Sequence, residues 1–348
     1  MNISVTTRNL FSLLRSGLFG QQETIEPLSV WKWGQLQKMA AMHGISALVY
    51  DGLQNCADQF FATIPSQHME QWQTAVATTE QANRKYNVAL SDLYPKLAAE
   101  LTRPVLVSGH ALGILYNNPY HRTPNPISFY FPYETKAKKA DQWIKQNATQ
   151  PFDSQRNTLG YTWMEAKVEN RRRLLTLANT LNNRTLQQII EEEFLAVPPT
   201  YININGTKTE TISPTLQLFI LLIDMSQCIM SEGFMARQLA DLGIFLRKAG
   251  DKVDFVKLQT WTERLNLTAF AQLEGTMLME LLGFEADELP FMDTTTDISE
   301  ILRKELSGKD ATNQWRIKRS ARYFRYYPAE SLAGLLTSFA KTLSQIEE

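Results

Sequence analysis

The stretch from Pro104 to Pro132 constrains the fold of this chain more than any other segment, and it reads PVLVSGHALGILYNNPYHRTPNPISFYFP. A short apolar run over 105–107 is followed by a turn at Ser108 and Gly109, and then by a helix-like segment that reaches Tyr116. A proline-rich loop comes next, and a second apolar run over 127–131 ends the stretch. The pattern predicts a strand, a glycine turn, a helix and a returning strand, which would form the centre of an α/β core.

The glycine turn is a candidate anion site. Backbone N–H groups at a tight turn and at the start of a helix point outward and can bind phosphate oxygens. Ser108, Gly109 and His110 form this turn, and Arg122 in the following loop can supply a guanidinium. We therefore predict nucleotide binding at these four residues. For His110, and for His121 beside Arg122, a purely structural role is the alternative.

This stretch resembles the core of an uncharacterised nucleotidyltransferase family of Bacteroides-type bacteria, within the DNA polymerase β-like superfamily. The family reads roughly Leu-Leu-Lys-Gly, a helix, Tyr-Pro, and then Arg-x-x-Gly-Asp-Ile-Asp-Leu-Tyr-Val. In the same frame, without a gap, this chain has Val107-Ser108-Gly109, Asn118-Pro119 and then residues 122–131. The resemblance extends from Trp31 to Glu330. It implies a nucleotidyltransferase-type fold, with a small mixed sheet framed by N- and C-terminal helices.

The chain departs from the family at the residues that carry the chemistry. Pro126 and Ser128 stand where the family has its pair of aspartates, and Ser108 stands where it has a lysine. Nucleotidyl transfer needs a divalent metal held by hard, anionic oxygens, and aspartates two apart on a strand point to one face and can share that metal. Proline has no side-chain oxygen, and serine has only a neutral hydroxyl. We predict no catalytic residues and no metal site.

A third carboxylate of the family corresponds to Glu169, the only remnant of the metal site. The alternating residues Tyr161 to Glu169 predict one strand that ends near this carboxylate. One carboxylate cannot organise two metal ions, so we expect Glu169 to pair with Arg171 or Arg172. The run Arg171-Arg172-Arg173 has two interpretations: a phosphate clamp, for which Arg171 is the candidate nucleotide-binding residue, or a solvated end of a strand.

The segments around this core are mainly helical in pattern. A long stretch from Trp72 to Leu101 predicts one extended helix, and apolar spacings predict shorter helices before it. We predict an α+β protein, predominantly helical, with an N-terminal helical region (1–101), a nucleotidyltransferase-like core (102–180), a linker with a hairpin (181–212) and a C-terminal helical region (213–348). Ser213 and Pro214 indicate the start of a helix in the last region.

The C-terminal region holds two further candidate sites. The family commonly has His-x-x-x-His where this chain has Asp224 and Cys228, which leaves only two candidate metal ligands. The tail over 303–325 mixes arginines and lysines with aromatic residues, a mixture that suits a single-stranded nucleic acid or an ordinary amphipathic helix. We favour a structural role for both.

Composition excludes several classes of protein. The chain has 348 residues, 44% hydrophobic and 20% charged, with a formal net charge of −1, which gives no field for nucleic acid or membrane binding. Cys56 and Cys228 are far apart and form no zinc motif. The N-terminal stretch lacks the apolar core of a signal peptide because Arg8 and Arg15 interrupt it. We expect a cytoplasmic protein, with neither nucleic acid nor membrane as a partner.

Three functions stay open on the sequence. The first is a catalytically inactive nucleotidyltransferase-like protein that binds a nucleotide without a cofactor. The second is an active, Mg²⁺-dependent transferase whose carboxylates, such as Glu134, Glu165 or Glu169, come from new positions. The third is a scaffold that binds a protein partner, with the old site filled by side chains such as Phe129, Tyr130 or Tyr133. We favour an inactive protein, with a nucleotide or a protein as its partner.

Overall fold

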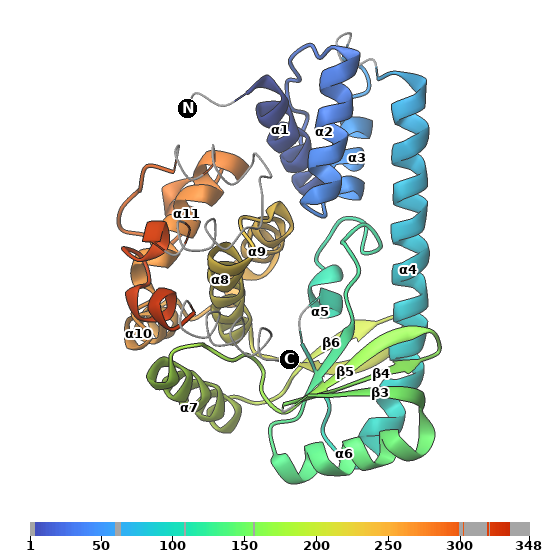
Figure 1. The fold of residues 1–348 in the computed structure, drawn as a ribbon, viewed down its shortest axis with the longest axis vertical. Helices are drawn as coiled ribbons and strands as arrows, with labels where there is room; N and C mark the ends of the chain where they lie inside the picture. Colours follow the sequence, from blue (N-terminus) through green and yellow to red (C-terminus); the bar gives the residue numbers. More distant parts are fainter. Residues whose placement is uncertain are drawn as a thin grey trace, which may run out of the picture. The chain divides into compact units, whose positions relative to one another are not determined.

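A computed structural model describes residues 4–59, 64–107, 109–155, 157–298, 302, 319 and 321–334. The chain forms two compact units. We call residues 12–175 and 191–213 the sheet unit, and residues 1–11, 176–190 and 214–348 the helical unit. Helices hold most of the described residues, and one mixed sheet holds the strands (Figure 1). The predicted α+β class is therefore confirmed.

The sheet has seven strands in the order β3-β4-β5-β2-β1-β7-β6. Its centre is the stretch that the sequence indicated: β1 pairs antiparallel with β2, and β2 pairs parallel with β5. β7 adds to the other side of β1 in parallel. The strands are β1 (Val105–Val107), β2 (Ile127–Tyr130), β3 (Thr149–Gln155), β4 (Thr158–Trp163), β5 (Ala166–Arg171), β6 (Thr200–Ile204) and β7 (Thr207–Thr211).

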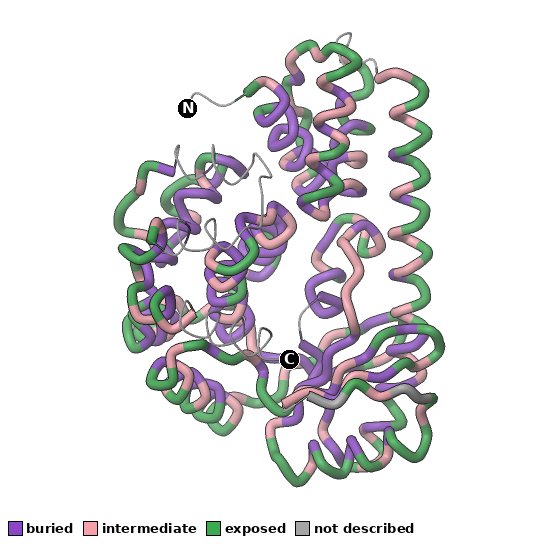
Figure 2. Tube along the Cα trace, in the orientation of Figure 1, coloured by how far each residue is buried: buried purple, intermediate pink, exposed green. Residues whose placement is uncertain are grey.

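Two helices cover one face of this sheet. The long helix α4 (Ser66–Ala99) and α6 (Glu134–Asn147) enclose a single apolar core against β1, β2, β4 and β5. On α6 the buried residues Ala137, Ala140 and Ile144 recur every three or four positions, so the helix buries one side against the sheet and exposes the other (Figure 2). Burial of these apolar faces is the main contribution to the stability of the unit.

The central strand β2 alternates between the two faces of the sheet. Ile127 and Phe129 belong to the core under α4 and α6, so Ser128 and Tyr130 lie on the opposite face. All four are buried. On this second face the Tyr130 ring lies 5.4 Å from the ring of Phe194, between centroids. Ser128 therefore lies on the face of the sheet that α4 and α6 do not cover.

The single strand predicted over Tyr161 to Glu169 is wrong. The segment forms two antiparallel strands, β4 and β5, joined by a tight turn at Met164 and Glu165. Both turn residues have positive φ, 47° and 65°, the backbone of a hairpin turn that glycine or asparagine usually occupies. The turn contains neither glycine nor asparagine. The alternation of apolar and polar residues therefore continues through it, and the sequence gives no sign of a turn.

The stretch predicted as a linker and hairpin contains α7 (Thr180–Ala196) and the antiparallel pair β6–β7. The predicted hairpin is confirmed, with Asn205 and Gly206 at its turn, both at positive φ. Because β7 also pairs with β1, the hairpin belongs to the central sheet. The remaining helices before the sheet are α1 (Val5–Phe19), α2 (Val30–Met42) and α3 (Ser46–Asn55), and the extended helix predicted from Trp72 is α4.

The helical unit is built around α8 (Pro214–Ser231), which contacts α9 (Ala236–Ala249), α10 (Phe255–Arg264) and α11 (Thr268–Leu282). The predicted helix start at Pro214 is confirmed. By length and composition α8 could cross a membrane, but 61% of that stretch is buried within the structure. A strongly apolar helix that is mostly buried against other helices is typical of a protein core.

Candidate functional site

The sheet places two positions of the predicted site side by side. β2 and β5 are adjacent and parallel, and Ser128 is the registered partner of Glu169. Pro126 immediately precedes β2. Residues paired in neighbouring strands place their side chains on the same face. Ser128 and Glu169 are therefore neighbours on the sheet, and Pro126 precedes Ser128 by two residues in the chain. We call positions 126, 128 and 169 the cluster.

Arg171 supplies the positive charge that pairs with the carboxylate in this cluster. Arg171, two residues after Glu169 on β5, donates from Nε at 3.0 Å and from Nη2 at 2.8 Å to Oε2 of Glu169. The same oxygen lies 3.4 Å from Oγ of Ser128. The pairing of Glu169 with an arginine is as the sequence predicted. Both charged side chains are about one-third exposed, so the pair contributes about 1 kcal/mol or less to stability.

These residues do not fit the Mg²⁺ ion that nucleotidyl transfer requires. Mg²⁺ takes an octahedron of oxygens and is usually held by one or two free carboxylates. Here Pro126 offers only its carbonyl, which lies 3.5 Å from Oγ of Ser128, and Oε2 of Glu169 is taken by a guanidinium. Within the described ranges, no group of three or more His, Cys, Asp or Glu residues could hold a metal ion. Of the carboxylates considered for an active enzyme, Glu134 pairs with Lys138 and Glu165 pairs with Lys85.

The glycine turn is covered by the chain itself. A Cβ atom added to Gly109 would overlap Oδ1 of Asn125 and Nη1 of Arg122, so these two side chains lie directly over the glycine. Arg122 donates from Nη1 to Oδ1 of Asn125 at 2.6 Å and to the carbonyl of Thr123 at 3.1 Å. Arg122 thus lies at the turn, as the sequence indicated. Both of these bonds from Nη1 stay within its own loop.

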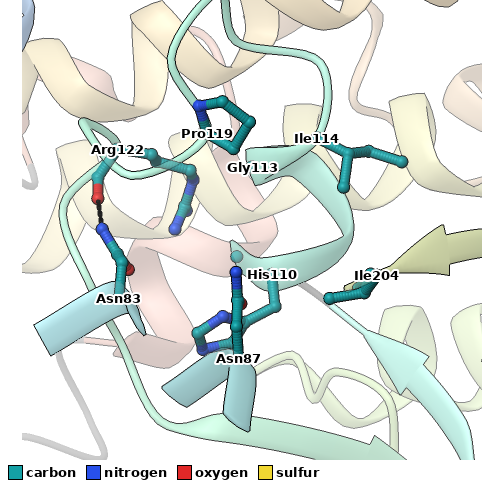
Figure 3. A pocket seen from close by; sticks show the side chains of 9 residues that line it. Asn83, Asn87, His110, Gly113, Ile114, Pro119, Arg122 and Ile204 are labelled. Carbon is teal, nitrogen blue, oxygen red and sulfur yellow. Dashed lines mark hydrogen bonds between the residues drawn. The ribbon is translucent and has the colours of Figure 1, made fainter. Parts of the chain in front are cut away.

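A small cavity of about 20 Å³ lies between α4 and the turn (Figure 3). This is room for about one water molecule, whereas ligand sites usually measure hundreds of cubic ångströms. Helix α5 (Gly109–Gly113), which follows the turn, is also shorter than the segment to Tyr116 that the apolar pattern predicted. The cavity is lined by Asn83, Asn87, Gly109, His110, Gly113, Ile114, Pro119, Arg122 and Ile204.

His110 is a neutral, structural side chain in this arrangement. Burial lowers its pKa to about 4, an effect that the nearby charge of Arg122 reinforces and the hydrogen bond to Asn125 opposes. Its Nε2 lies 2.9 Å from the backbone carbonyl of Asn125, which can only accept, so Nε2 carries the proton. The donor predicted for a phosphate is therefore already used inside the fold.

Two asparagines that the sequence did not single out complete the closure. Asn83 on α4 donates through Nδ2 to the carbonyls of Tyr120 and Arg122, at 2.7 Å each, and so holds the loop from below (Figure 3). Asn125 caps the guanidinium of Arg122. No motif marks either residue in the sequence, and the partners of Asn83 are backbone carbonyls 37 and 39 residues away.

The other candidates lie elsewhere or are structural. Arg172 pairs with Asp141 of α6 at 3.0 Å, away from Glu169, and Arg173 is exposed. Cys228 is buried, with its thiol 3.5 Å from the carbonyl of Gly233, and burial raises its pKa to about 12, which opposes metal binding. Ser108 and most of the basic, aromatic tail (303–318) lie outside the described residues.

Comparison with known proteins places most of the sequence in one family. The profile of the family described as "Uncharacterised nucleotidyltransferase" matches residues 30–283. Among solved structures, the chain is similar to an antigenic nucleotidyltransferase-like protein from Paracoccidioides brasiliensis, with 18% identity and a TM-score of 0.35 over 52% of this chain and 87% of that one. No curated protein matches the chain. The family profile spans most of the sequence, including every strand of the sheet, and the chain therefore belongs to this uncharacterised nucleotidyltransferase family.

Proposed function

We propose that this protein is a catalytically inactive member of its family, in which the metal site has become an internal charge pair. The observation that carries the proposal is the contact of Arg171 with Glu169 beside Ser128. A guanidinium neutralises the remaining carboxylate, as a metal would, but it cannot lower the pKa of an attacking hydroxyl or bridge a triphosphate. Phosphoryl-transfer catalysis is mostly positioning and electrostatics, so losing the metal costs orders of magnitude in rate.

Without catalysis, the protein would act by binding a partner at this closed site. The covered glycine turn favours a protein partner as the ligand of the intact fold, because the cavity of about 20 Å³ has no room for a nucleotide. Metal-independent nucleotide binding is the second candidate. It is favoured by the position of Arg122, whose Nη1 lies directly over Gly109 and would need only to exchange Asn125 for a phosphate oxygen.

A thermal-shift titration with the four ribonucleoside triphosphates, each with and without Mg²⁺, separates these possibilities. A ligand that binds only the native state stabilises it by about 2.7 kcal/mol at a hundred times its Kd, so micromolar binding is easily seen. We expect no Mg²⁺-dependent shift. A Mg²⁺-dependent shift that disappears in Glu169→Gln would contradict the proposal.

The same titration tests the second candidate with a matched pair of variants. A shift that needs no Mg²⁺ and is lost in Arg122→Met would establish nucleotide binding at the glycine turn. Arg172→Met is the control, since its guanidinium pairs with Asp141 of α6. No shift in any condition leaves the protein-binding role as the proposal.

A further inference from the structure

A buried histidine links the loop over the glycine turn to two helices. We call residues 114–126, between α5 and β2, the Arg122 loop. His121 in this loop is 7% exposed. Its Nδ1 lies 2.8 Å from both carboxylate oxygens of Asp51 on α3, and its Nε2 lies 2.9 Å from Oε1 of Glu80 on α4. Each ring nitrogen therefore faces a carboxylate that belongs to a different helix.

This geometry requires the charged form of the ring. Carboxylate oxygens only accept hydrogen bonds, and a histidine donates from both nitrogens only as an imidazolium. When the ring loses one proton, a nitrogen lone pair faces a carboxylate, so a charge-assisted hydrogen bond is replaced by repulsion. One of the two hydrogen bonds that His121 makes, to Asp51 on α3 or to Glu80 on α4, is then lost.

Three side chains make further contacts between the loop and other segments through groups that do not titrate. Asn83 holds the carbonyls of Tyr120 and Arg122, and the hydroxyl of Thr123 donates to the carbonyl of Gly44. Asn117 donates to the carbonyl of Leu18 at 3.1 Å. These bonds join neutral groups. The charge of His121 is therefore the component of the closure that responds to pH near neutrality.

We propose that Asp51, His121 and Glu80 form a charge latch that holds the Arg122 loop closed over the Gly109 turn and releases it when His121 loses its proton. Release would withdraw Arg122 and Asn125 from the turn, since both belong to the loop, and would uncover the backbone beside Gly109. The latch is independent of the proposed loss of catalysis, because it concerns only the contacts that hold the loop.

The charged and titratable groups that face His121 set the direction of its response. Asp51 on α3 and Glu80 on α4 contact the ring, Arg84 on α4 pairs with Glu80 and lies over Tyr120 of the loop, and Arg122 is the next residue in the chain. Arg84 lies 3.6 Å from Oε2 of Glu80, with its guanidinium 4.2 Å from the centre of the Tyr120 ring. Burial acts to lower the pKa of His121, but the hydrogen bonds and charges of Asp51 and Glu80 outweigh it, so the pKa is raised above 6.5.

The sign of the effect follows from these directions. Because the pKa of His121 is raised in the folded protein, its stabilisation is fully present below pH 6.5 and is lost as the pH rises through the folded pKa. The hydrogen bond from His121 lowers the pKa of Glu80 below 4.5, so that contribution is present above pH 4.5 and is lost as the pH falls through the folded value. The latch should be firmest between these limits.

Hydrogen–deuterium exchange tests the latch in the full-length protein. Protection of amides in residues 114–126, corrected for the intrinsic pH dependence of exchange, is expected to fall by up to about tenfold per pH unit above the His121 midpoint. Asp51→Asn and Glu80→Gln should already lose this protection at pH 6.5. Glu134→Gln, which removes an exposed carboxylate paired with Lys138 on α6, should not.

Selective ¹³C labelling of the four histidines supplies a second readout that needs no latch variant. Histidine→Gln variants identify the His121 signal, by elimination from the other three if His121→Gln does not fold. Its midpoint is expected above 6.5 in the wild type, and the loss of loop protection should follow the same titration. A His121 midpoint at or below 6.5 overturns the latch, as does loop protection that stays constant while His121 titrates or that is equal in wild type, Asp51→Asn and Glu80→Gln.

Discussion

Gly52→Ala is expected to lower the free energy of unfolding of the sheet unit by about 3 kcal/mol, the upper part of the range for overpacked cores. A Cβ atom at Gly52 on α3 would overlap the carbonyl oxygen of Leu13 on α1 and lie 2.7 Å from its carbonyl carbon. The obstruction is backbone, which cannot rotate away as a side chain does. One helix must therefore move as a body and loosen the packing around both.

Gly17→Ala tests the same contact between α1 and α3, with the added Cβ atom on α1. Its Cβ would overlap the carbonyl oxygen of Leu48 on α3 and lie 3.0 Å from the carbonyl carbon. We expect a loss of similar size, and a double variant that loses less than the sum, because one displacement of the helices relieves both overlaps.

Gly250→Ala is the control for both substitutions. Its backbone is helical, with φ −61°, and the nearest atom to an added Cβ would be a side-chain carbon of Leu246 at 4.0 Å. Its stability should change by less than about 0.5 kcal/mol. Urea unfolding measures all three variants. If Gly17→Ala and Gly52→Ala behave like Gly250→Ala, α1 and α3 do not approach one another as described.

Restoring the family's carboxylates is expected to create a metal site. In the triple variant Pro126→Asp, Ser128→Asp and Arg171→Met, two new carboxylates join Glu169 and the competing guanidinium is gone. Position 128 is registered beside Glu169 on adjacent strands, and residues 126 and 128 share a face if β2 continues back by one residue. Without metal, like charges in this cluster should destabilise the variant relative to the wild type.

A metal site in the triple variant should show as stabilisation of the folded protein by Mn²⁺ or Mg²⁺. At a metal concentration a hundred times the Kd, the variant should gain about 2.7 kcal/mol, measured by chemical unfolding with and without metal. The control carries Asn at positions 126 and 128 with the same Arg171→Met change, and it keeps the shapes without the charges. An equal response of the two variants, or none in either, would mean that these positions do not converge as the sheet register indicates.

The local parts of the fold followed from the sequence. The apolar runs at β1 and β2, the proline at the start of α8 and the Asn205-Gly206 turn each depend on neighbouring residues, and these predictions are confirmed. The turn between β4 and β5 was missed because Met164 and Glu165 adopt a backbone that their residue types seldom take. The short α5 was overestimated because Ile114, although apolar, is 37% exposed after the helix has ended.

The closure of the site could not be predicted in the same way. It depends on Asn83, His121 and Asp51, whose partners lie 37 to 70 residues away in the sequence. The frame of the family placed Arg122 at the glycine turn, but a guanidinium over a glycine serves a phosphate or a neighbouring amide equally well. Only the position of Asn125 decides between them in the structure.

The central claim is that the Ser128, Glu169 and Arg171 cluster cannot support metal-dependent transfer, and the release of pyrophosphate tests it most directly. The purified protein is incubated with each of the four ribonucleoside triphosphates and Mg²⁺ or Mn²⁺, with Glu169→Gln in parallel. We predict that wild type and Glu169→Gln release pyrophosphate at the same background rate with every nucleotide. Metal-dependent release by the wild type, abolished in Glu169→Gln, would show that the site is active and contradict the account.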